Sequence, residues 1–274
     1  MKSTGKFISF ILLSAILFSS CAKDPVVDNP GDNIYTIRSI YGYGKTSSKF
    51  IYNSNGKITE SQSFYFCNRY IYADNGRLVR TETAADPDLY SSVAHERSEL
   101  MTSQNSTLTG YSIFEYKPDG ELKSVKNYFR KNELFEYTSM LSFEYDGGNI
   151  IKRKLHDSND VITQFYTYDY DLNNNVIQEN YFSCLFIAGT EPELIRETTY
   201  KYDGNNNPFK IYKELGQPGL YSNTNNIIET NSTLYVDTPG IEKYSTSKTN
   251  YEYNAKGFPV KVIDENSVYE YIYN

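Results

Sequence analysis

The sequence has no tryptophan and only two histidines and three cysteines among its 274 residues. A catalytic or metal-binding centre needs positioned acids, bases, nucleophiles or ligands, so the candidates for such a centre are few. A basic excess is missing too, because 27 Lys and Arg face 34 Asp and Glu for a formal net charge of −7. An acidic chain without basic clusters argues against nucleic acid and anionic lipid head groups as partners. We expect no cofactor, no metal site and no nucleic-acid partner.

Long apolar runs are absent except near the start, where FISFILLSAILF follows Lys2 and Lys6. This run is too short and too close to the terminus for a membrane-spanning helix, and its basic flank is typical of a secretory signal. It ends in LFSSC, a small-residue cleavage site followed directly by Cys21. The arrangement resembles the bacterial lipobox, which implies that residues 1–20 are a signal peptide and that Cys21 is lipidated. An ordinary secretory signal with a coincidental cysteine is the less favoured alternative.

Residues 21–33 are expected to be the lipidated cysteine and a flexible tether, since AKDPVVDNPGDN has two prolines and no periodicity. Each buried CH₂ of an acyl chain contributes about 0.8 kcal/mol, so the lipid of a bacterial lipoprotein would hold the protein in its membrane. Asp24 stands three places after Cys21, away from the position associated with inner-membrane retention. The Lys-Asp step loosely resembles the surface-export signals of Bacteroidetes-type lipoproteins. We expect an outer-membrane location and favour the cell-surface face, while the periplasmic face stays open.

The chain is rich in tyrosine, with 28 residues, and has 15 phenylalanines. Aromatic side chains favour strands, where they pack across neighbouring strands, so residues 34–274 are expected to form a single β domain. Cys67 and Cys184 lie in the strand-like stretches FYFCNRY and YFSCLFI. A disulfide between the two cysteines is the alternative, and two free thiols are the favoured interpretation.

One phrase recurs seven times along the chain: a tyrosine, a four-residue turn and an apolar residue, as in YNSNGKI and YADNGRL. The repeat tyrosines are Tyr52, Tyr72, Tyr116, Tyr145, Tyr170, Tyr202 and Tyr253. The fourth turn positions are Gly56, Gly76, Gly120, Asn149, Asn174, Asn206 and Gly257. Gly and Asn accept a left-handed backbone at the least cost, and a type I turn favours Asn or Asp at its first position. The phrase therefore predicts a hairpin loop made of a type I turn and a left-handed residue.

The residues around each turn alternate in the manner of strands. A second aromatic lies two positions before every repeat tyrosine, which puts both rings on one face of the incoming strand. Two strands for each turn, with IYTIRSI and YEYIYN at the ends able to pair with each other, give roughly 14–16 strands. We predict an all-β, antiparallel, up-and-down meander that curls into a barrel-like sheet.

Two connections, 81–110 and 213–249, are long. In the first, Asp86 can cap a helix and Pro87 suits its first position, so we predict a helix over residues 87–101. The second is expected to hold further strands, because NIIETNSTLYV and EKYSTSKTNYEY alternate.

A barrel that spans a bilayer needs strands of about 9–11 residues and an unbroken apolar outer band. The stretches KSVKNYFRKNE and IIKRKLHD instead place Lys and Arg on both strand faces. A barrel or curved sheet that stands in water, held by its lipid, is favoured over a pore.

FEYDGGNII and YKYDGNNNPF resemble the tyrosine-aspartate, or RHS-type, repeat, in which an aromatic and a Tyr-Asp pair precede a short turn and an aliphatic residue. The lipobox, the length and the whole array resemble a family of Bacteroidetes lipoproteins of unknown function with a porin-like fold. This resemblance covers about residues 35–274 and implies a porin-like barrel. Its motif is structural, so it implies no catalytic residue.

Two histidines are the candidates for acid–base chemistry. His95 lies in HERSE, which lacks the second histidine of a zinc-binding helix, so a solvated helix face is the favoured reading. His156 and Asp157 could pair a base with an orienting carboxylate, but no nucleophilic serine motif accompanies them.

Asp171, Asn173 and Asn175 match the opening of a calcium loop. Val176 and Phe182 stand where that loop needs Gly and Glu, however, and turn chemistry already explains the three polar residues.

Stacked tyrosines on a sheet face could form a sugar platform, although core packing is the favoured role and tryptophan is absent. The preferred hypothesis is a non-catalytic, lipid-anchored envelope protein that binds a ligand or protein partner through its variable loops, with a glycan among the ligand classes. One alternative is a structural or assembly component of an outer-membrane complex. The other is a hydrolase with an unrecognised site.

Overall fold

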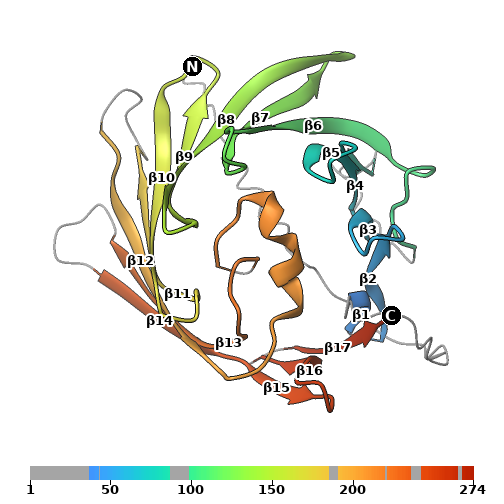
Figure 1. The fold of residues 1–274 in the computed structure, drawn as a ribbon, viewed down its shortest axis with the longest axis vertical. Coiled ribbons are helices and arrows are strands. Elements are labelled where there is room, and N and C mark those ends of the chain that lie inside the picture. The colour runs from blue at the N-terminus through green and yellow to red at the C-terminus, as the bar shows by residue number, and fades with distance from the viewer. Residues whose placement is uncertain are drawn as a thin grey trace, which may run out of the picture.

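The computed structural model describes residues 37–42, 44–86, 99–184, 191–219, 221–235, 242–264 and 267–274. Its strands form one antiparallel sheet that curls into a ring (Figure 1). The strands are β1 (Ile37–Gly42), β2 (Lys45–Tyr52), β3 (Ile58–Ser63), β4 (Phe66–Tyr72), β5 (Leu78–Ala85), β6 (Thr107–Tyr116), β7 (Leu122–Lys131), β8 (Leu134–Asp146), β9 (Asn149–Asp157), β10 (Ile162–Tyr170), β11 (Val176–Ser183), β12 (Glu193–Tyr202), β13 (Ile227–Tyr235), β14 (Glu242–Lys248), β15 (Asn250–Tyr253), β16 (Pro259–Ile263) and β17 (Val268–Tyr273). The described chain also contains a 3-10 helix, η1 (Pro208–Leu215).

The ring closes through the two terminal strands. Each strand from β1 to β13 pairs with the next, as do β15 with β16 and β16 with β17, and β17 pairs with β1, where Tyr273 lies opposite Ile37. Only Thr249 separates β14 from β15; β14 pairs with β13 and β15 pairs with β16. The predicted antiparallel, barrel-like meander is therefore confirmed, and so is the pairing of its first and last strands.

Five of the seven predicted turns have a left-handed residue at the expected place. At the first, Gly56 has φ 71°, its amide donates to the carbonyl of Asn53 at 3.0 Å, and the Asn53 amide donates to Lys57 at 2.9 Å. The Asn53 side chain also accepts the amides of Asn55 and Lys57, both at 3.0 Å, which explains an Asn or Asp at the first turn position. Positive φ values also occur at Gly76, Gly120, Asn174 and Gly257.

The predictions for Asn149 and Asn206 are wrong. Between β8 and β9 the chain reverses on Gly147 and Gly148 (φ 55° and 83°), so Asn149 is already a strand residue opposite Asp146. Two consecutive glycines allow the two-residue turn, in which both central residues have positive φ. Asn206 follows β12, where no hairpin forms: the chain enters the barrel, and the Asn206 amide donates to Gly257 on another turn at 2.9 Å.

The turns of the repeated phrase lie at one edge of the barrel, which we call the tight-turn rim. The opposite edge, the long-loop rim, carries the connections of variable length, as predicted. One of these, between β9 and β10, repeats the tight-turn geometry: the Asp157 amide donates to Val161 at 2.9 Å and Asp160 has φ 66°.

Several predicted segments lie outside the described residues: the signal peptide 1–20, Cys21 with its tether 21–33, and His95. Most of the predicted helix 87–101 lies outside as well, and its last three residues, 99–101, are not helical. The predicted strands of the second long connection are present as β13 and β14, but residues 213–226 are not strands.

The two barrel faces differ in chemistry. The repeat aromatics face inward, because Phe50 and Tyr52 pack with Phe209 and Tyr212 of the segment inside the ring. The outer face carries ion pairs between neighbouring strands, with nitrogen–oxygen distances of 2.6–2.8 Å. These pairs are Lys126–Glu115, Lys201–Glu229 and Lys261–Glu252.

Cys67 and Cys184 form no disulfide with each other, so the favoured interpretation of two thiols agrees with the structure. Burial raises the pKa of the Cys67 thiol to about 12, which keeps it protonated. Of the described residues, none belongs to a helix with the length and hydrophobicity of a bilayer span.

Candidate functional site: the barrel lumen and its plug

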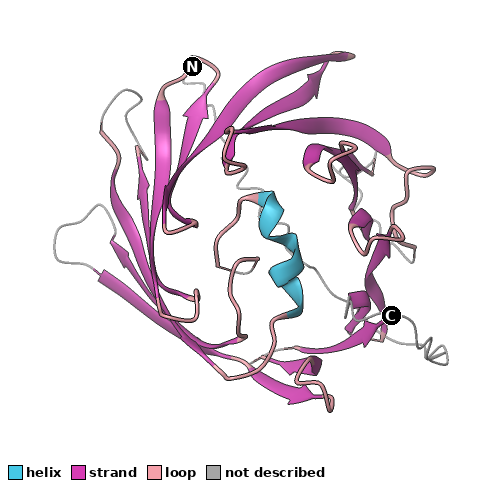
Figure 2. Cartoon of the chain, in the orientation of Figure 1, coloured by secondary structure: helices cyan, strands magenta, loops and turns pink. Residues whose placement is uncertain are grey.

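The connection between β12 and β13 folds into the interior of the barrel, and we call its described residues, 203–219 and 221–226, the plug. Its helix η1 stands inside the ring of strands (Figure 2). The Asn207 side chain caps the helix by accepting the Phe209 amide at 3.0 Å, and Pro208 occupies the first turn. The helix ends at Gly216, which has φ 65° and donates to the Lys213 carbonyl at 3.1 Å.

Apolar contacts hold the plug at the tight-turn rim. Leu215 packs against both hydrophobic clusters of the wall, one around Ile58 and one around Leu78 and Leu122. The fit is close at Gly216, where a Cβ atom would lie 2.7 Å from Leu122 Cδ2. Glycine is therefore required there both for its positive φ and for the space.

Buried asparagines fix the other end of the plug. Asn175, which is 1% exposed, accepts the amides of Thr224 and Asn225 at 2.9 and 3.0 Å. Asn223, fully buried, accepts the Val176 amide at 2.8 Å. These hydrogen bonds offset part of the cost of burying the amide groups, while Asn223 Nδ2 is buried without a partner.

These contacts explain the residues behind the calcium hypothesis. Asp171 accepts the amides of Asn173 and Asn175 at 2.8 Å each, and its second oxygen accepts the Asn175 side chain at 3.0 Å. The described residues contain no group of three or more His, Cys, Asp or Glu side chains that could hold a metal ion.

The repeat tyrosines connect successive hairpins from inside the barrel. Tyr116 donates its hydroxyl to the Leu78 carbonyl at 2.8 Å, and Leu78 begins the outgoing strand of the preceding hairpin. Four further bonds follow the same rule: Tyr145 to Leu122, Tyr170 to Ile150, Tyr202 to Val176 and Tyr273 to Pro259. Burial raises the pKa of Tyr116 to about 12, so the hydroxyl stays a donor at neutral pH. Four of the seven repeat tyrosines, and Tyr273 of the last strand, thus bond to the hairpin before them.

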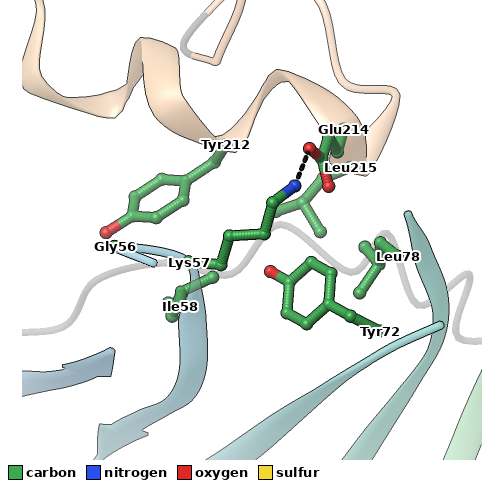
Figure 3. A pocket seen from close by; sticks show the side chains of 8 residues that line it. All are labelled: Gly56, Lys57, Ile58, Tyr72, Leu78, Tyr212, Glu214 and Leu215. Atoms are coloured by element: carbon green, nitrogen blue, oxygen red, sulfur yellow. Dashed lines mark hydrogen bonds and ion pairs between the residues drawn. The ribbon is translucent and has the colours of Figure 1, made fainter. Parts of the chain in front are cut away.

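A cavity of about 110 Å³ lies between the plug and the wall (Figure 3). Lys57 reaches into it and pairs with Glu214 of the plug at 2.6 Å, while its ammonium group lies 5.1 Å from the Tyr72 ring centroid. The Tyr212 hydroxyl lies 2.5 Å from that of Tyr52. The Lys57 ammonium group already has a partner, and the cavity has room for only a few water molecules. We therefore assign this cavity to the interface between plug and wall, and not to a ligand.

Beyond the plug, toward the long-loop rim, the inner wall becomes polar. Asn127 accepts the Ser112 hydroxyl at 2.7 Å and donates to Ser139 at 3.1 Å, across three neighbouring strands. Asn68 accepts the Thr83 hydroxyl at 2.8 Å in the same way. These side chains share strand faces with the inward aromatics and are only half-buried. We call these five residues the polar belt.

His156 faces outward, and its partners differ from the prediction. Its Nε2 lies 2.8 Å from Ser142 Oγ, and its Nδ1 lies 3.0 Å from a carboxylate oxygen of Asp160, not of Asp157. The order of groups is that of a hydrolase triad, but an acyl-transfer site also needs donors for an oxyanion. Ser142 pairs with Ser124 on one side and Lys154 on the other, so the sheet uses the backbone amides around it. Asp160, moreover, is 74% exposed.

The sequence contains start and stop signals for the plug helix, but we predicted a hairpin turn there because the repeated phrase precedes them. Asn207 and Pro208 are a helix cap and a first-turn proline, and Gly216 is a helix stop, yet they follow a copy of the turn phrase. Period-two counting places Arg196 on the same strand face as Tyr200 and Tyr202. The strand of Arg153 contains no aromatic residue, so this arginine had no such signal.

No protein-family model matches the chain, and no curated protein matches it. Among solved structures it is similar to a porin-like protein from Bacteroides uniformis, with 11% identity and a TM-score of 0.37, over 87% of this chain and 98% of that one. A porin-like protein from Bacteroides vulgatus gives 12% identity and a TM-score of 0.36, over 87% and 99% of the two chains. The chain is also similar to TcdB2-TccC3, with 13% identity and a TM-score of 0.31, but it spans only 10% of that chain. Similarities at this level say nothing about function.

Proposed function

We propose that the protein is a non-catalytic, lipid-anchored binding protein of the bacterial envelope, and that its barrel lumen takes a polar ligand, a glycan, from the side of the long-loop rim. The observation that carries this proposal is the division of the lumen. The plug fills the tight-turn end with apolar contacts, whereas the wall beyond it presents the polar belt.

The polar belt suits a carbohydrate because its members are hydroxyls and amides, which both donate and accept hydrogen bonds. Sugars offer the same groups in return, and aromatic rings nearby provide faces for their apolar sides. Phe114 lies two residues after Ser112, and Phe143 lies two residues after Leu141. Both rings are therefore on the same inner strand faces, at the next inward position toward the plug. A ligand in the lumen would therefore meet hydrogen-bonding groups on the wall and rings toward its floor.

The anchor proposal rests on the sequence before the barrel and on the outer wall. Ion pairs between neighbouring strands, such as Lys126–Glu115, lie on the outer face. Charged side chains there would raise the free energy of the protein strongly in the hydrocarbon of a bilayer but only slightly in water. A barrel that stands in water beside its membrane needs a separate attachment, which the lipidated Cys21 would provide.

The binding proposal is tested by a glycan array with the full chain carrying Cys21→Ser, followed by calorimetry on the strongest hits. We expect Asn127→Ala to weaken binding about tenfold, because it removes a belt group that meets both Ser112 and Ser139. Asn180→Ala is the matched control, since Asn180 bonds Thr167 at 3.3 Å on the outer face. An array without hits, or equal effects of the two variants, would contradict the proposal.

The anchor is tested separately by fractionating cells that express the chain with and without Cys21→Ser. We expect the unaltered protein in the membrane fraction and the variant in the aqueous fraction, since the variant has no thiol to acylate. Continued membrane retention of the variant would disprove the lipid anchor.

A second candidate is a role in envelope assembly, and an aromatic patch on the outer face favours it. Tyr111 stacks on Tyr128 at 4.7 Å and meets Phe135 at 5.2 Å, while Leu134 at the end of the same hairpin is 73% exposed. The three rings are half-buried, and aromatic residues beside an exposed apolar side chain are typical of protein interfaces. Tyr111→Ser would then abolish co-purification of an envelope partner, and the lumen variants would leave it intact.

A further inference from the structure

Two arginines and two tyrosines form a continuous stack on the inner wall of β9 to β12. Arg153 lies opposite Tyr166, Tyr166 opposite Tyr181, and Tyr181 opposite Arg196 in the pairing of the four strands. The two rings stack at 4.7 Å. The Arg153 guanidinium lies 4.7 Å from the Tyr166 centroid, and that of Arg196 lies 5.7 Å from the Tyr181 centroid. We call these four residues the arginine–tyrosine ladder.

The ladder faces the lumen. Tyr166 stands on the same strand face as Tyr168 and the repeat tyrosine Tyr170, which donates to the Ile150 carbonyl at the tight-turn rim. Water reaches part of it, because the Arg196 side chain is 41% exposed although it points inward.

Unpaired hydrogen-bond donors are concentrated at the ladder. Four buried side-chain atoms of the described residues have no hydrogen-bond partner, and three of them are Arg153 Nε, Arg196 Nε and the Tyr168 hydroxyl. Tyr168 is 3% exposed and lies next to the ladder on β10. Leaving a buried donor unpaired costs about 1–3 kcal/mol, and more when it is charged. Three such donors together indicate a place built to receive an acceptor.

The local charge is positive in an acidic protein. Glu179, 15% exposed, is the acidic partner, at 3.5 Å from Arg196, and two arginines therefore share one carboxylate. Burial raises the pKa of Glu179, with the two arginines opposing that shift. The whole chain has a formal net charge of −7, so a cationic patch inside the barrel does not follow from its composition.

We propose that the arginine–tyrosine ladder binds the carboxylate of an acidic saccharide in the lumen. Guanidinium groups recognise carboxylates through paired, charge-assisted N–H bonds, and the unpaired Nε atoms supply donors for them. The Tyr168 hydroxyl offers one further donor. The inference rests on the proposed function and narrows its ligand to uronic-acid-containing glycans.

The test is calorimetry of the full chain carrying Cys21→Ser with short oligogalacturonate and with the same oligosaccharide fully methyl-esterified. The two probes differ in charge and share the sugar ring. We expect the acid to bind and the ester to bind at least tenfold more weakly. Arg196→Gln should reduce affinity for the acid about tenfold and leave the ester unchanged. Arg80→Gln is the control, because Arg80 stacks on Tyr111 on the outer face, 3.9 Å from its centroid.

A second variant, Glu179→Gln, distinguishes a loss of the binding site from a failure to fold. It removes the carboxylate that competes for the arginines, so we expect tighter binding of the acid, and a misfolded variant cannot produce a gain. Unchanged or weaker acid binding in a folded Glu179→Gln protein would overturn the ladder proposal.

The outcomes separate the two proposals. If acid and ester bind equally, or neutral glycans bind and oligogalacturonate does not, the ladder proposal is wrong and binding in the lumen stands. If neither probe binds and the glycan array gives no hit, both proposals fall.

Discussion

The two ends of the barrel enclose one lumen with opposite chemistry. At the tight-turn rim, the first residues of the outgoing strands are almost fully buried against the plug, as Leu78 (1% exposed) and Val176 (0%) show. Toward the long-loop rim, the inward side chains are half-buried and polar, among them Asn127 and Asn68. Since burial of apolar area is the main source of stability, we infer that the tight-turn end holds the fold together. The other end is then free to carry binding groups.

The repeat explains why the division follows the rims. Every copy of the phrase puts an aromatic, a tyrosine and an aliphatic residue beside its turn, so the apolar groups and the tyrosine bonds collect at one edge. No such rule acts on the residues farther along each strand, and they vary in chemistry from strand to strand.

The largest effect is expected from alkaline pH, which acts on many tyrosines of the tight-turn end together. Burial raises the pKa of Tyr52, Tyr116 and Tyr145 to about 12, from an ordinary value of 10.0. The folded state thus keeps protons that the unfolded chain loses. Stability should be fully present below about pH 10 and fall as pH rises toward about 12. Urea midpoints across this range, followed with tyrosinate absorbance, would check it; a flat profile would contradict burial of these hydroxyls.

A smaller but still large effect is expected from Gly216→Ala at the end of the plug helix. The new Cβ would lie 2.7 Å from Leu122 and 2.9 Å from Phe143, in a backbone with φ 65°. Overpacking and left-handed strain together should lower the free energy of unfolding by about 2–4 kcal/mol. Gly204→Ala is the matched control, because nothing lies within 4 Å of its Cβ position. Equal urea midpoints for the two variants would show that the plug does not stabilise the barrel.

The smallest effect on stability is expected at the long-loop end. Asn127→Ala removes two hydrogen bonds, but the partner hydroxyls of Ser112 and Ser139 are half-buried and can turn to water. We expect a change below about 1 kcal/mol in the free energy of unfolding, together with the loss of glycan binding proposed above. A loss of stability as large as that of Gly216→Ala would remove the contrast between the two ends.

Much of the barrel could be predicted from local pattern. The turn phrase predicted the hairpins because Gly56 and its equivalents must adopt a conformation that few residues tolerate. Alternation predicted which faces are aromatic, and the terminal stretches predicted the closing pair of β1 with β17. The two wrong turn positions have local causes: a second glycine before Asn149 permits a shorter turn, and the cap and proline after Asn206 start a helix.

The lumen site was beyond such reasoning. Arg153, Glu179 and Arg196 are far apart in the chain, and only the register of four strands brings them together. On the outer face, the pairing of β8 with β9 brings Ser142 to His156, and the carboxylate partner of the histidine is Asp160, four residues on, and not its neighbour in sequence.

By itself, the sequence determined where the chain turns, which residues form strands and which face of each strand is aromatic, because these depend on the φ preferences and side-chain alternation of a few adjacent residues. The tertiary structure alone decided that the aromatic faces look inward, that the plug fills one end of the barrel, and that two arginines meet across its wall. Those outcomes depend on how the strands close into a ring of sixteen positions, counting β14 and β15 as one. Ring closure brings together residues that are far apart in the sequence, and no local sequence pattern specifies such contacts.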